Sequence, residues 1–290
     1  MRAGREMPDA TEQREERMRS ADDDSDIQQF DDSGEGKDRQ FVTALARGLE
    51  LLRCFGERER ELGLTELARR TGIPKPTVAR LAGTLAKLGY LDHLEAEGRY
   101  RLGAGVLALG FGMLARLDVR ETARPLMRDL AERTQASVSL GVRDRLSMVY
   151  VESVRSSASI GLQRGVGTRL ALATTALGRA YLAGMPAPER AGLLQQLRQR
   201  DAADWPRLQA GVDQAVRDYA ERGFCISIGE WDKDVCGVGV PFRAPDGTMM
   251  SFNCGKPAFK CSREYLEREL GPALVELVRK VGGSMGRGNA

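Results

Sequence analysis

The stretch "PKPTVARLAGTLAKLGYL", residues 74–91, constrains the fold of this chain more than any other segment. Its two prolines fall where a helix begins, because the first helical turn does not need the N–H that proline lacks. Two stripes then recur every three or four residues, so each stripe runs along one face of a helix. The apolar stripe is Val78, Leu81, Leu85 and Leu88, and the polar stripe is Thr77, Arg80, Thr84 and Lys87.

The segments on either side of this helix predict a winged helix-turn-helix. An earlier helix, "TALARGLELLRCF", carries an apolar face of Leu45, Leu49, Leu52 and Phe55. Thr65 is the expected N-cap of a second helix that ends at Gly72. After the third helix, "YLDHLEAEGRYRLG" alternates around a turn in which Gly98 suits a positive φ, as in a β-hairpin. Three helices followed by a hairpin make this fold.

A polar stripe on the third helix of such a fold favours binding to double-stranded DNA. A helix fits the major groove by size, and residues near its N-terminus reach bases and phosphates. Arg80 can pair with a guanine, whereas lysines suit phosphates. The candidate DNA-binding residues are Arg69, Arg70, Lys75, Thr77, Arg80, Thr84, Lys87, Arg99 and Arg101. The alternative is that each is an ordinary exposed side chain; helix order, wing and outward charge together favour DNA.

The charge of the chain is unevenly distributed. Its net charge is +3, but residues 1–40 carry seven basic and thirteen acidic side chains, so the remainder is +9. A basic remainder permits nucleic-acid binding without proving it. Residues 1–40 lack apolar periodicity and are expected to be a disordered acidic tail. That tail is either a solvated segment or one that competes with DNA.

Beyond the hairpin, the sequence predicts a linker helix and a second, α+β domain. The segment "VLALGFGMLARLD", residues 106–118, is apolar nearly all round, so something must bury it. It packs either on a partner chain or in the core of its own chain. Later strands and helices suggest one antiparallel sheet with helices packed on it. The expected domains are a tail at 1–40, the winged helix-turn-helix at 41–104, the linker helix at 105–119 and the sensor domain at 120–285.

Residue usage argues against several classes of protein. The five cysteines form no CxxC pair, and His93 is the only histidine, so we expect no catalytic residue, no metal ion and no cofactor. An enzyme would have to pair Cys254 with a carboxylate. The acidic N-terminus is unlike a signal peptide, and no apolar run reaches the length of a membrane span. These features favour a cytoplasmic protein with no membrane partner.

The stretch from "FVTALARGLELLRCF" through "YRLGAGVLALG" resembles the N-terminal domain of the IclR-family transcriptional regulators. The resemblance continues through "TTALGRAYLAG", "YAERGFCISIGEWDKDVCGVGVPFRAPDG" and "SFNCGKPA", and covers about residues 41–285. It implies a GAF-like effector-binding domain, homodimers or dimers of dimers, and palindromic operators. It also implies control by a small metabolite, often a carboxylate or an aromatic acid.

The second domain offers a weaker ligand signal from its own residues. Thr174 and Thr175 open a helix whose free N–H groups and dipole suit an anion. Gly178 permits close approach of a ligand or another backbone, and Gly237 and Gly239 leave room beside it. The alternatives are a capped helix with a packing glycine and a tightly packed core. Two further open questions are whether "GEWDKD" (Glu230 to Asp232) lines the pocket or is solvated, and whether Met148 and Tyr150 line it or belong to the core.

The resemblance sharpens this set of ligand contacts. Together with Thr175, the effector-binding residues it implies are Ala176, Leu177, Ser227, Gly237, Phe252 and Cys254. Some family members have an acid at Ser227, a cysteine at Gly237, and serines at Phe252 and Cys254. The replacements predict a larger and drier pocket, and an effector larger and more aromatic than a two- or three-carbon acid.

The sequence therefore predicts a ligand-responsive, DNA-binding transcriptional regulator. Two other classes stay open at this point. One is an architectural DNA binder that takes no ligand. The other is an enzyme that acts on a small acid and uses the first domain for recruitment to DNA.

Overall fold

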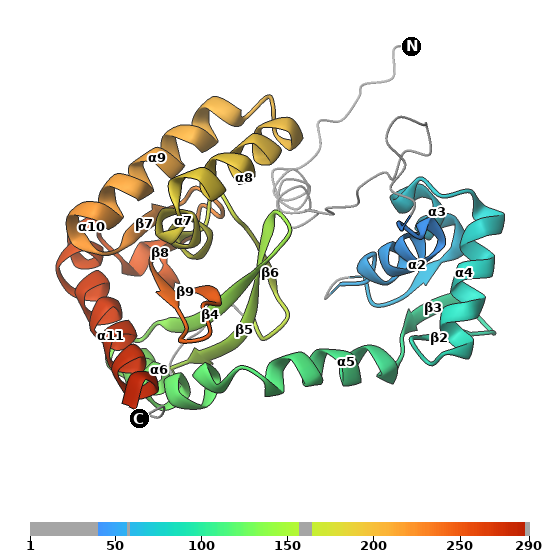
Figure 1. The fold of residues 1–290 in the computed structure, drawn as a ribbon, viewed down its shortest axis with the longest axis horizontal. Coiled ribbons are helices and arrows are strands. Elements are labelled where there is room, and N and C mark those ends of the chain that lie inside the picture. Colours follow the sequence, from blue (N-terminus) through green and yellow to red (C-terminus); the bar gives the residue numbers. More distant parts are fainter. Residues whose placement is uncertain (1–39, 57–58, 157–163, 288–290) are drawn as a thin grey trace, which may run out of the picture. The chain divides into compact units, whose positions relative to one another are not determined.

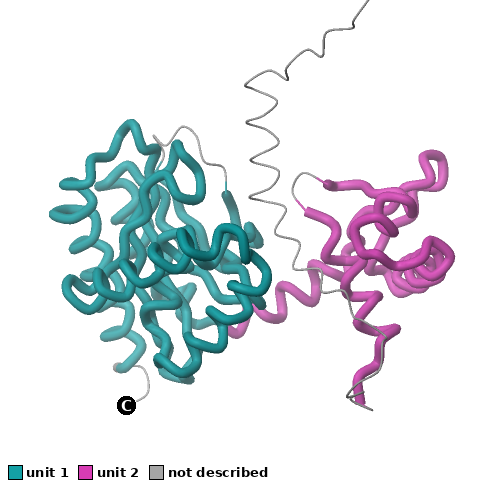
Figure 2. Tube along the Cα trace, turned by 90° about the horizontal axis from the view of Figure 1, so that it is seen from above, with its two compact units in different colours: residues 1–24, 117–290 teal, residues 25–116 magenta. Residues whose placement is uncertain are grey.

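The computed structural model describes residues 40–56, 59–156 and 164–287. Contacts between residues divide these into two compact units, one ending at Arg116 and the other starting at Leu117 (Figure 2). The expected disordered tail lies outside the described residues except for Gln40. None of the helices in these ranges is long and apolar enough to cross a membrane.

The first unit is a winged helix-turn-helix with a helix appended to it. Its three-stranded antiparallel sheet has the order β1-β3-β2, so β2 and β3 form the expected hairpin and β1 adds a strand that the sequence did not predict. The elements are α2 (Thr43–Arg53), β1 (Leu62–Gly63), α3 (Leu64–Thr71), α4 (Lys75–Lys87), β2 (Leu91–Leu94), β3 (Arg99–Leu102) and α5 (Ala104–Ala115).

The core of this unit forms where the apolar faces of the three helices meet the hairpin. Its most buried members are Leu51, Leu67, Val78, Ala82 and Leu91. Helix α2 buries only part of the expected face: Phe55, just after the helix, is in the core and Leu52 packs against it. The side chains around Leu51 point inward, while those of Leu45 and Leu49 are 63% and 51% exposed. On α4 the buried stripe is likewise centred on Val78 and Ala82, which leaves Leu88 in solvent.

The ends of α3 and the hairpin turn depend on specific residues. Gly72 ends α3 with φ 67°, and Gly98 turns the hairpin with φ 62°, both as expected. The N-cap is Gly63 and not Thr65, because β1 runs directly into the helix. The Glu66 carboxylate accepts a hydrogen bond from the Gly63 N–H at 2.8 Å, and this bond holds the pKa of Glu66 below its usual value.

Helix α5 starts one residue before and ends four residues before the expected linker helix at 105–119. A Cβ on Gly103 would lie 2.5 Å from the Gly89 carbonyl oxygen, so the start of α5 packs directly against the end of α4. The rest of the helix exposes apolar side chains on more than one face. Their exposed fractions are 75% for Leu107, 64% for Leu109 and 67% for Phe111.

The second unit is built on a six-stranded antiparallel sheet of order β6-β5-β4-β9-β8-β7. The expected α+β class with a single antiparallel sheet is confirmed. The strands are β4 (Ser137–Asp144), β5 (Ser147–Arg155), β6 (Arg169–Ala171), β7 (Cys225–Ile228), β8 (Val235–Arg243) and β9 (Met249–Pro257). The helices are α6 (Asp118–Thr134), α7 (Ala176–Gly184), α8 (Ala187–Arg200), α9 (Trp205–Arg222), α10 (Arg263–Tyr265) and α11 (Gly271–Arg287), with a 3₁₀ turn η1 (Ala258–Lys260) and a π turn η2 (Leu266–Leu270).

Helices cover both faces of this sheet (Figure 1). Helix α7 packs on one face, with α8 and α9 beyond it; a Cβ on Gly239 of β8 would lie 2.1 Å from the Ala176 carbonyl oxygen. Helices α6 and α11 pack on the other face, where Arg120 of α6 pairs with the buried Glu152 of β5 at 3.3 Å. The sheet is therefore buried on both sides, so its strands show little alternation between apolar and polar residues.

Two irregularities set the register of the β4–β5 hairpin. The pairing shifts between Leu140 and Gly141, and a Cβ on Gly141 would lie 2.7 Å from the Leu177 side chain. The turn places Arg145 at φ 54°, which is uncommon for a residue with a side chain. The third strand of this unit in chain order, β6, lies at Arg169–Ala171. The segment "SIGLQ" at 159–163, whose sequence also indicates a strand, lies outside the described residues.

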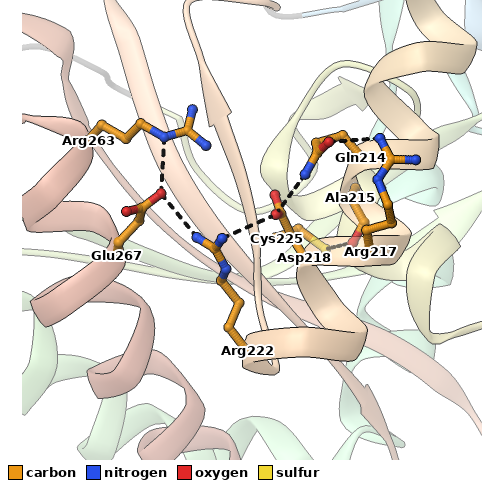
Figure 3. A network of polar contacts seen from close by, with 8 residues as sticks. All are labelled: Gln214, Ala215, Arg217, Asp218, Arg222, Cys225, Arg263 and Glu267. Atoms are coloured by element: carbon orange, nitrogen blue, oxygen red, sulfur yellow. Dashed lines mark hydrogen bonds and ion pairs between the residues drawn. The ribbon is translucent and has the colours of Figure 1, made fainter.

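A polar network ties α9 to the C-terminal helical segment (Figure 3). Arg222 lies between Asp218 of its own helix, at 3.7 Å, and Glu267 of η2, at 3.0 Å. Arg263 adds a second hydrogen bond to Glu267 at 3.0 Å. The C-terminal helix is irregular just before Gly271 and Pro272. Pro272 has no N–H to donate back along the helix, and the preceding turn widens into η2.

Candidate nucleic-acid interface and ligand cavity

The polar face of α4 carries unengaged positive charge. Lys75, Arg80 and Lys87 are exposed and make no ion pair within the described part of the chain. Thr77 is half-buried beside them, and Thr84 is exposed. The Thr84 hydroxyl donates to the Arg80 carbonyl oxygen at 2.9 Å, so only its lone pairs remain for another partner. These five side chains share one face of α4, as the helical spacing predicts.

The two arginines of α3 differ in their surroundings. Arg69 is exposed. Arg70 is half-buried and donates to the Cys54 carbonyl oxygen at 3.4 Å and to the Glu59 carboxylate at 3.3 Å. Because these contacts hold Arg70 within the unit, the structure favours Arg69 over Arg70 as the cation that α3 offers to a phosphate.

The wing arginines also have partners inside the unit. Arg99 donates to the Glu61 carbonyl oxygen at 2.6 Å and pairs with Glu66 at 3.1 Å. Arg101 pairs with Asp92 at 3.1 Å, and about half of each side chain stays exposed. An exposed pair of this kind contributes little and can exchange partners. Arg101 is therefore more available to a phosphate than Arg99.

A cavity of about 60 Å³ lies in the second unit, between the start of α7 and the sheet. A single water needs about 10–15 Å³ by this measure, so the cavity has room for several waters or a small molecule. Several polar side chains interrupt a wall that is otherwise mainly apolar. It is lined by Ser137, Ser139, Tyr150, Ser153, Arg164, Leu170, Thr175, Ala176, Ser227, Trp231, Asp232, Val235, Cys236, Gly237, Asn253 and Gly255.

The N-terminus of α7 forms one wall of this cavity. Thr175 is its N-cap: the hydroxyl accepts from the Gly178 N–H at 3.1 Å and donates to the Ala171 carbonyl oxygen at 2.7 Å. The N–H groups of Ala176 and Leu177 precede the first intrahelical hydrogen bond and remain as donors. With the helix dipole, they favour an anion at this wall.

Gly178 acts in packing and not in ligand contact. A Cβ at this position would lie 2.2 Å from the Leu172 carbonyl oxygen, so the backbone before the helix occupies the space that the missing side chain leaves. Of the two alternatives raised by the sequence, the packing glycine is the one observed.

Two buried polar atoms in residues of the cavity wall lack a partner among the described residues. They are the indole Nε1 of Trp231, which is a donor, and the amide Oδ1 of Asn253, which is an acceptor. The Tyr150 hydroxyl lies beside Asn253 and Ser139, and burial raises its pKa, so it stays protonated. A buried polar atom without a partner costs about 1–3 kcal/mol. A ligand with one acceptor and one donor would satisfy both.

Three of the expected ligand contacts lie outside the cavity wall. The Leu177 side chain belongs to the apolar cluster under α7. Phe252 packs edge-on against Phe242, with ring centroids 5.7 Å apart, and Cys254 lies near Thr134 of α6. On β9, Phe252 and Cys254 therefore face α6 and α11, while their neighbours Asn253 and Gly255 face the cavity. These two replacements therefore lie away from the cavity wall and do not themselves make it drier.

The other expected residues do line the cavity: Thr175, Ala176, Ser227 and Gly237. The Ser227 hydroxyl donates to the Thr174 carbonyl oxygen at 2.7 Å, so its lone pairs face a ligand. Tyr150 lines the cavity as well, while Met148 belongs to the apolar cluster beneath α7.

Cys254 has no activated thiol. Burial raises its pKa to about 12, so the thiol stays protonated near neutral pH. Its side chain also faces away from the cavity. The enzyme alternative thus loses the nucleophile that it required.

The acidic loop of "GEWDKD" is neither wholly solvated nor wholly part of the cavity wall. Glu230 makes a bidentate ion pair with Arg179 of α7, whose side chain is only 3% exposed. Arg179 also donates to the Ala173 carbonyl oxygen at 2.9 Å. The next residues, Trp231 and Asp232, line the cavity. The ion pair therefore connects the loop to the backbone that leads into α7.

Sequence reasoning missed the serines of the β4–β5 hairpin and Asn253. A signal was present, because polar residues within strands that are otherwise apolar need partners or a cavity. Ser137, Ser139 and Asn253 are such residues. Arg164 was also missed; its guanidinium lies 4.1 Å from the centre of the Trp231 ring.

Two family models match the chain. The IclR helix-turn-helix domain matches residues 44–95. The C-terminal domain of the bacterial transcriptional regulator IclR matches residues 111–282, which is more than half of the chain.

Individual relatives agree with these matches. The chain is 35% identical over 261 residues to the HTH-type transcriptional regulator TsaQ1/TsaQ2 of Comamonas testosteroni, covering 89% of this chain and 92% of that protein. A solved IclR family transcriptional regulator from Brucella abortus is similar at a TM-score of 0.82 and 45% identity, covering 89% and 98%. An IclR homologue from Microbacterium hydrocarbonoxydans, solved in complex with 4-hydroxybenzoate, shares the fold at a TM-score of 0.64 and 20% identity, covering 84% and 99%.

Proposed function

The chain belongs to the IclR family of transcriptional regulators, and we propose that a small organic or aromatic acid controls its affinity for a palindromic operator in double-stranded DNA. The observation that carries the proposal is the cavity at the start of α7, whose wall holds donors and an acceptor without partners. The exposed cations of α4, which make no ion pair within the described residues, support the proposed binding to DNA.

In this proposal α4 lies in the major groove. Arg80, exposed and without an ion-pair partner in the described chain, reads a guanine through two hydrogen bonds. Lys75 and Lys87 contact phosphates near the two ends of the helix, and Arg69 contacts a flanking phosphate. The wing contributes through Arg101, which exchanges its Asp92 partner for a phosphate.

The cavity takes the acid with its carboxylate at the start of α7. The N–H groups of Ala176 and Leu177 bind the carboxylate oxygens, and the Trp231 indole N–H supplies a further donor. A hydroxyl on the ligand donates to Asn253 Oδ1. A relative binds 4-hydroxybenzoate, which has both groups. We therefore keep the hypothesis that the effector is larger and more aromatic than a two- or three-carbon acid.

The exposed apolar residues of the first unit support a homo-oligomer, as a dimer or a dimer of dimers. On α5, Leu107 and Phe111 share one face, while Leu109 and Met113 share another, and all are at least 43% exposed. On α2, Leu45 and Leu49 are also exposed. Burying apolar surface stabilises association by about 25 cal/mol per Å². A second copy of this chain covers these faces in the proposed assembly.

The control mechanism has two states. Filling the cavity changes the packing of the sensor unit and, through the linker helix, the spacing of the two recognition helices in the dimer. Half-sites lie at a fixed helical phase, so a change in spacing alters operator affinity. A ligand shifts the equilibrium only by its difference in affinity for the two states.

The test starts from genomic DNA fragments that the purified full-length protein selects. Fluorescence anisotropy then gives the operator Kd at fixed salt, with and without candidate acids that include 4-hydroxybenzoate, pyruvate and glyoxylate. We expect an inverted repeat in the selected DNA and a change in Kd with an aromatic acid. Asn253→Leu should weaken the response to the acid and leave the acid-free Kd unchanged.

Three outcomes would count against parts of the proposal. If the protein prefers no duplex at low ionic strength, the proposed binding to DNA is wrong. If only pyruvate or glyoxylate stabilises the protein against heat and aromatic acids have no effect, the hypothesis of a larger, more aromatic effector is wrong. Sedimentation of the double variant Leu107→Glu, Phe111→Glu with the same mass as the parent protein removes α5 from the interface.

The architectural alternative, a DNA binder without a ligand, fits the cavity poorly. Such a protein has no use for unpaired polar atoms in an enclosed space, because a packed apolar core would be more stable there. An operator Kd that responds to no acid would favour it.

A further inference from the structure

Two of the five cysteines come together at the edge of the sheet, although they lie on different segments. Cys236 is in β8, opposite Lys256 of β9. After β9, the Ala258 N–H donates to the Asp234 carbonyl oxygen at 2.7 Å, and η1 turns the chain back. Cys261 follows directly, and its thiol lies within hydrogen-bonding reach of the Cys236 thiol.

The two thiols differ in their access to solvent. Cys236 is fully buried, whereas Cys261 is half-buried. The residues just before Cys261 are open to solvent, since the Phe259 side chain is 82% exposed. A small oxidant therefore reaches Cys261 first, with Cys236 directly behind it.

The surroundings of Cys261 favour its thiolate. The hydrogen bond from Cys236 lowers the pKa of Cys261, and the nearby Lys256 ammonium lowers it further. The same hydrogen bond, together with burial, raises the pKa of Cys236, so that thiol is the donor. Burial raises the pKa of Cys54 to about 11 and that of Cys225 to about 12. Cys261 is thus the reactive thiol of the described chain, because the thiolate is the nucleophile.

We propose that Cys236 and Cys261 are a redox-sensitive dithiol, which a peroxide converts to a reversible disulfide. The Cys261 thiolate attacks one peroxide oxygen and breaks the O–O bond, which gives a sulfenic acid and, after proton uptake, water or an alcohol. The Cys236 thiol then attacks the Cys261 sulfur, so that the S–S bond forms and the sulfenic oxygen leaves as water. The two thiols are oxidised by two electrons and the peroxide is reduced. A reducing dithiol reverses the bond by exchange.

The position of this pair connects it to the ligand cavity. Cys236 and its neighbour Gly237 both belong to the cavity wall. The Cys236 side chain points to the other face of the sheet, like that of Lys256 opposite it, so a disulfide would link β8 to the segment after β9 directly behind that wall. Transient disulfides of this kind act as redox sensors in reducing compartments. The inference concerns the cysteines alone and does not depend on which acid fills the cavity.

Peptide mapping tests the disulfide directly. The full-length protein is exposed to hydrogen peroxide, its free thiols are blocked with N-ethylmaleimide, and it is digested with trypsin without reduction. Trypsin places Cys236, Cys254 and Cys261 on the separate peptides 234–243, 244–260 and 261–263, because Lys256 precedes a proline and is not cut. We expect a cross-link between 234–243 and 261–263 and the loss of two of the five titratable thiols. Dithiothreitol should restore both.

Three cysteine variants test whether the cross-link and the reactivity of Cys261 depend on this pair. Cys261→Ser, at a half-buried position, should fold normally by circular dichroism and abolish the cross-link, while Cys54→Ala in the other unit should leave it unchanged. Iodoacetamide should alkylate Cys261 with a lower pH midpoint in the parent protein than in Cys236→Ala. Five free thiols after peroxide, a cross-link to 244–260, or an alkylation midpoint that Cys236→Ala does not move would overturn the proposal.

Discussion

Helices α4 and α7 each carry an arginine in their first half, and the two arginines have opposite surroundings. Arg80 of α4 is exposed and has no ion-pair partner in the described chain. Arg179 of α7 is 3% exposed in its side chain and makes a bidentate pair with Glu230. A long polyanion can be met by cations on an open surface, where salt screens them. A small anion needs an enclosed site with fixed donors. Here the nearby cation, Arg179, stabilises the wall of that site through its pair with Glu230.

The difference extends to the glycines of the two helices. A Cβ on Gly83 of α4 would have no atom within 4 Å, whereas a Cβ on Gly178 of α7 would lie 2.2 Å from the Leu172 carbonyl oxygen. A side chain can therefore be added at Gly83 of α4 without a clash, whereas one added at Gly178, near the start of α7, would clash with the backbone. Mutations on α4 should alter binding to DNA, and mutations near the start of α7 should alter stability and the cavity.

The largest expected effect separates these two glycines. Gly178→Ala should destabilise the protein by about 3 kcal/mol or more, because overpacking against backbone cannot be relieved by a rotamer change. Gly83→Ala should stabilise it by about 0.5–1 kcal/mol, since alanine loses less conformational entropy in a helix. Urea denaturation of both variants measures the contrast. Equal stabilities would contradict the close packing at the start of α7.

Removing Arg179 should have the next largest effect. Arg179→Met leaves Glu230 beside a buried site without its partner, and breaking such a pair costs about 3 kcal/mol, at the low end because 35% of the Glu230 side chain is exposed. Arg80→Met should change the free energy of unfolding by less than about 0.5 kcal/mol. A thermal-unfolding series on the two variants and the parent compares them. A similar small shift for both would show that the Arg179 pair does not stabilise the fold.

Arg80 should instead affect sequence recognition. Arg80→Ala should weaken specific operator binding by about 1–3 kcal/mol and relax the preference at one base position. Competition assays with a set of single-base operator variants measure this effect. Equal losses on operator and random DNA would remove Arg80 as a base-reading residue.

Lys87 should give the smallest and least specific effect. Lys87→Ala should lower affinity alike for operator and random duplexes and reduce the slope of log K against log salt by about 1. Anisotropy titrations at several salt concentrations provide the slope. A loss confined to the operator would mean that Lys87 contacts a base and not a phosphate.

The winged helix-turn-helix could be predicted from the sequence because its signals are local. The stripes of α4, Gly72 at the end of α3 and Gly98 in the hairpin turn are all recognised from spacings of a few residues. The error on α2 has a physical cause. Leu45 and Leu49 keep an apolar period but lie in solvent, so the apolar stripe on this helix marks a surface outside the core of its own unit.

The cavity could be predicted only in part, because it is built from segments far apart in the chain. Thr175 was found from the cap of α7, which is a local signal, whereas Ala176 was implied by the family resemblance. The family resemblance placed the contacts on β9 at Phe252 and Cys254, whereas Asn253 and Gly255 line the cavity. A strand buried on both faces shows no alternation from which its register could have been checked. A shift of one residue moves every side chain to the opposite face. Asn253 could have been found as a polar residue in an apolar strand.

In the proposed regulator, a ligand in the cavity of one unit changes the affinity of the other unit for DNA. The most direct test of this coupling is the operator Kd of the parent protein, measured by anisotropy across a titration of the acid that calorimetry shows to bind. Saturable binding should change the operator Kd by about 5- to 150-fold, and operator binding should change the Kd of the acid by the same factor. An operator Kd that stays constant while the acid saturates its site would contradict the account.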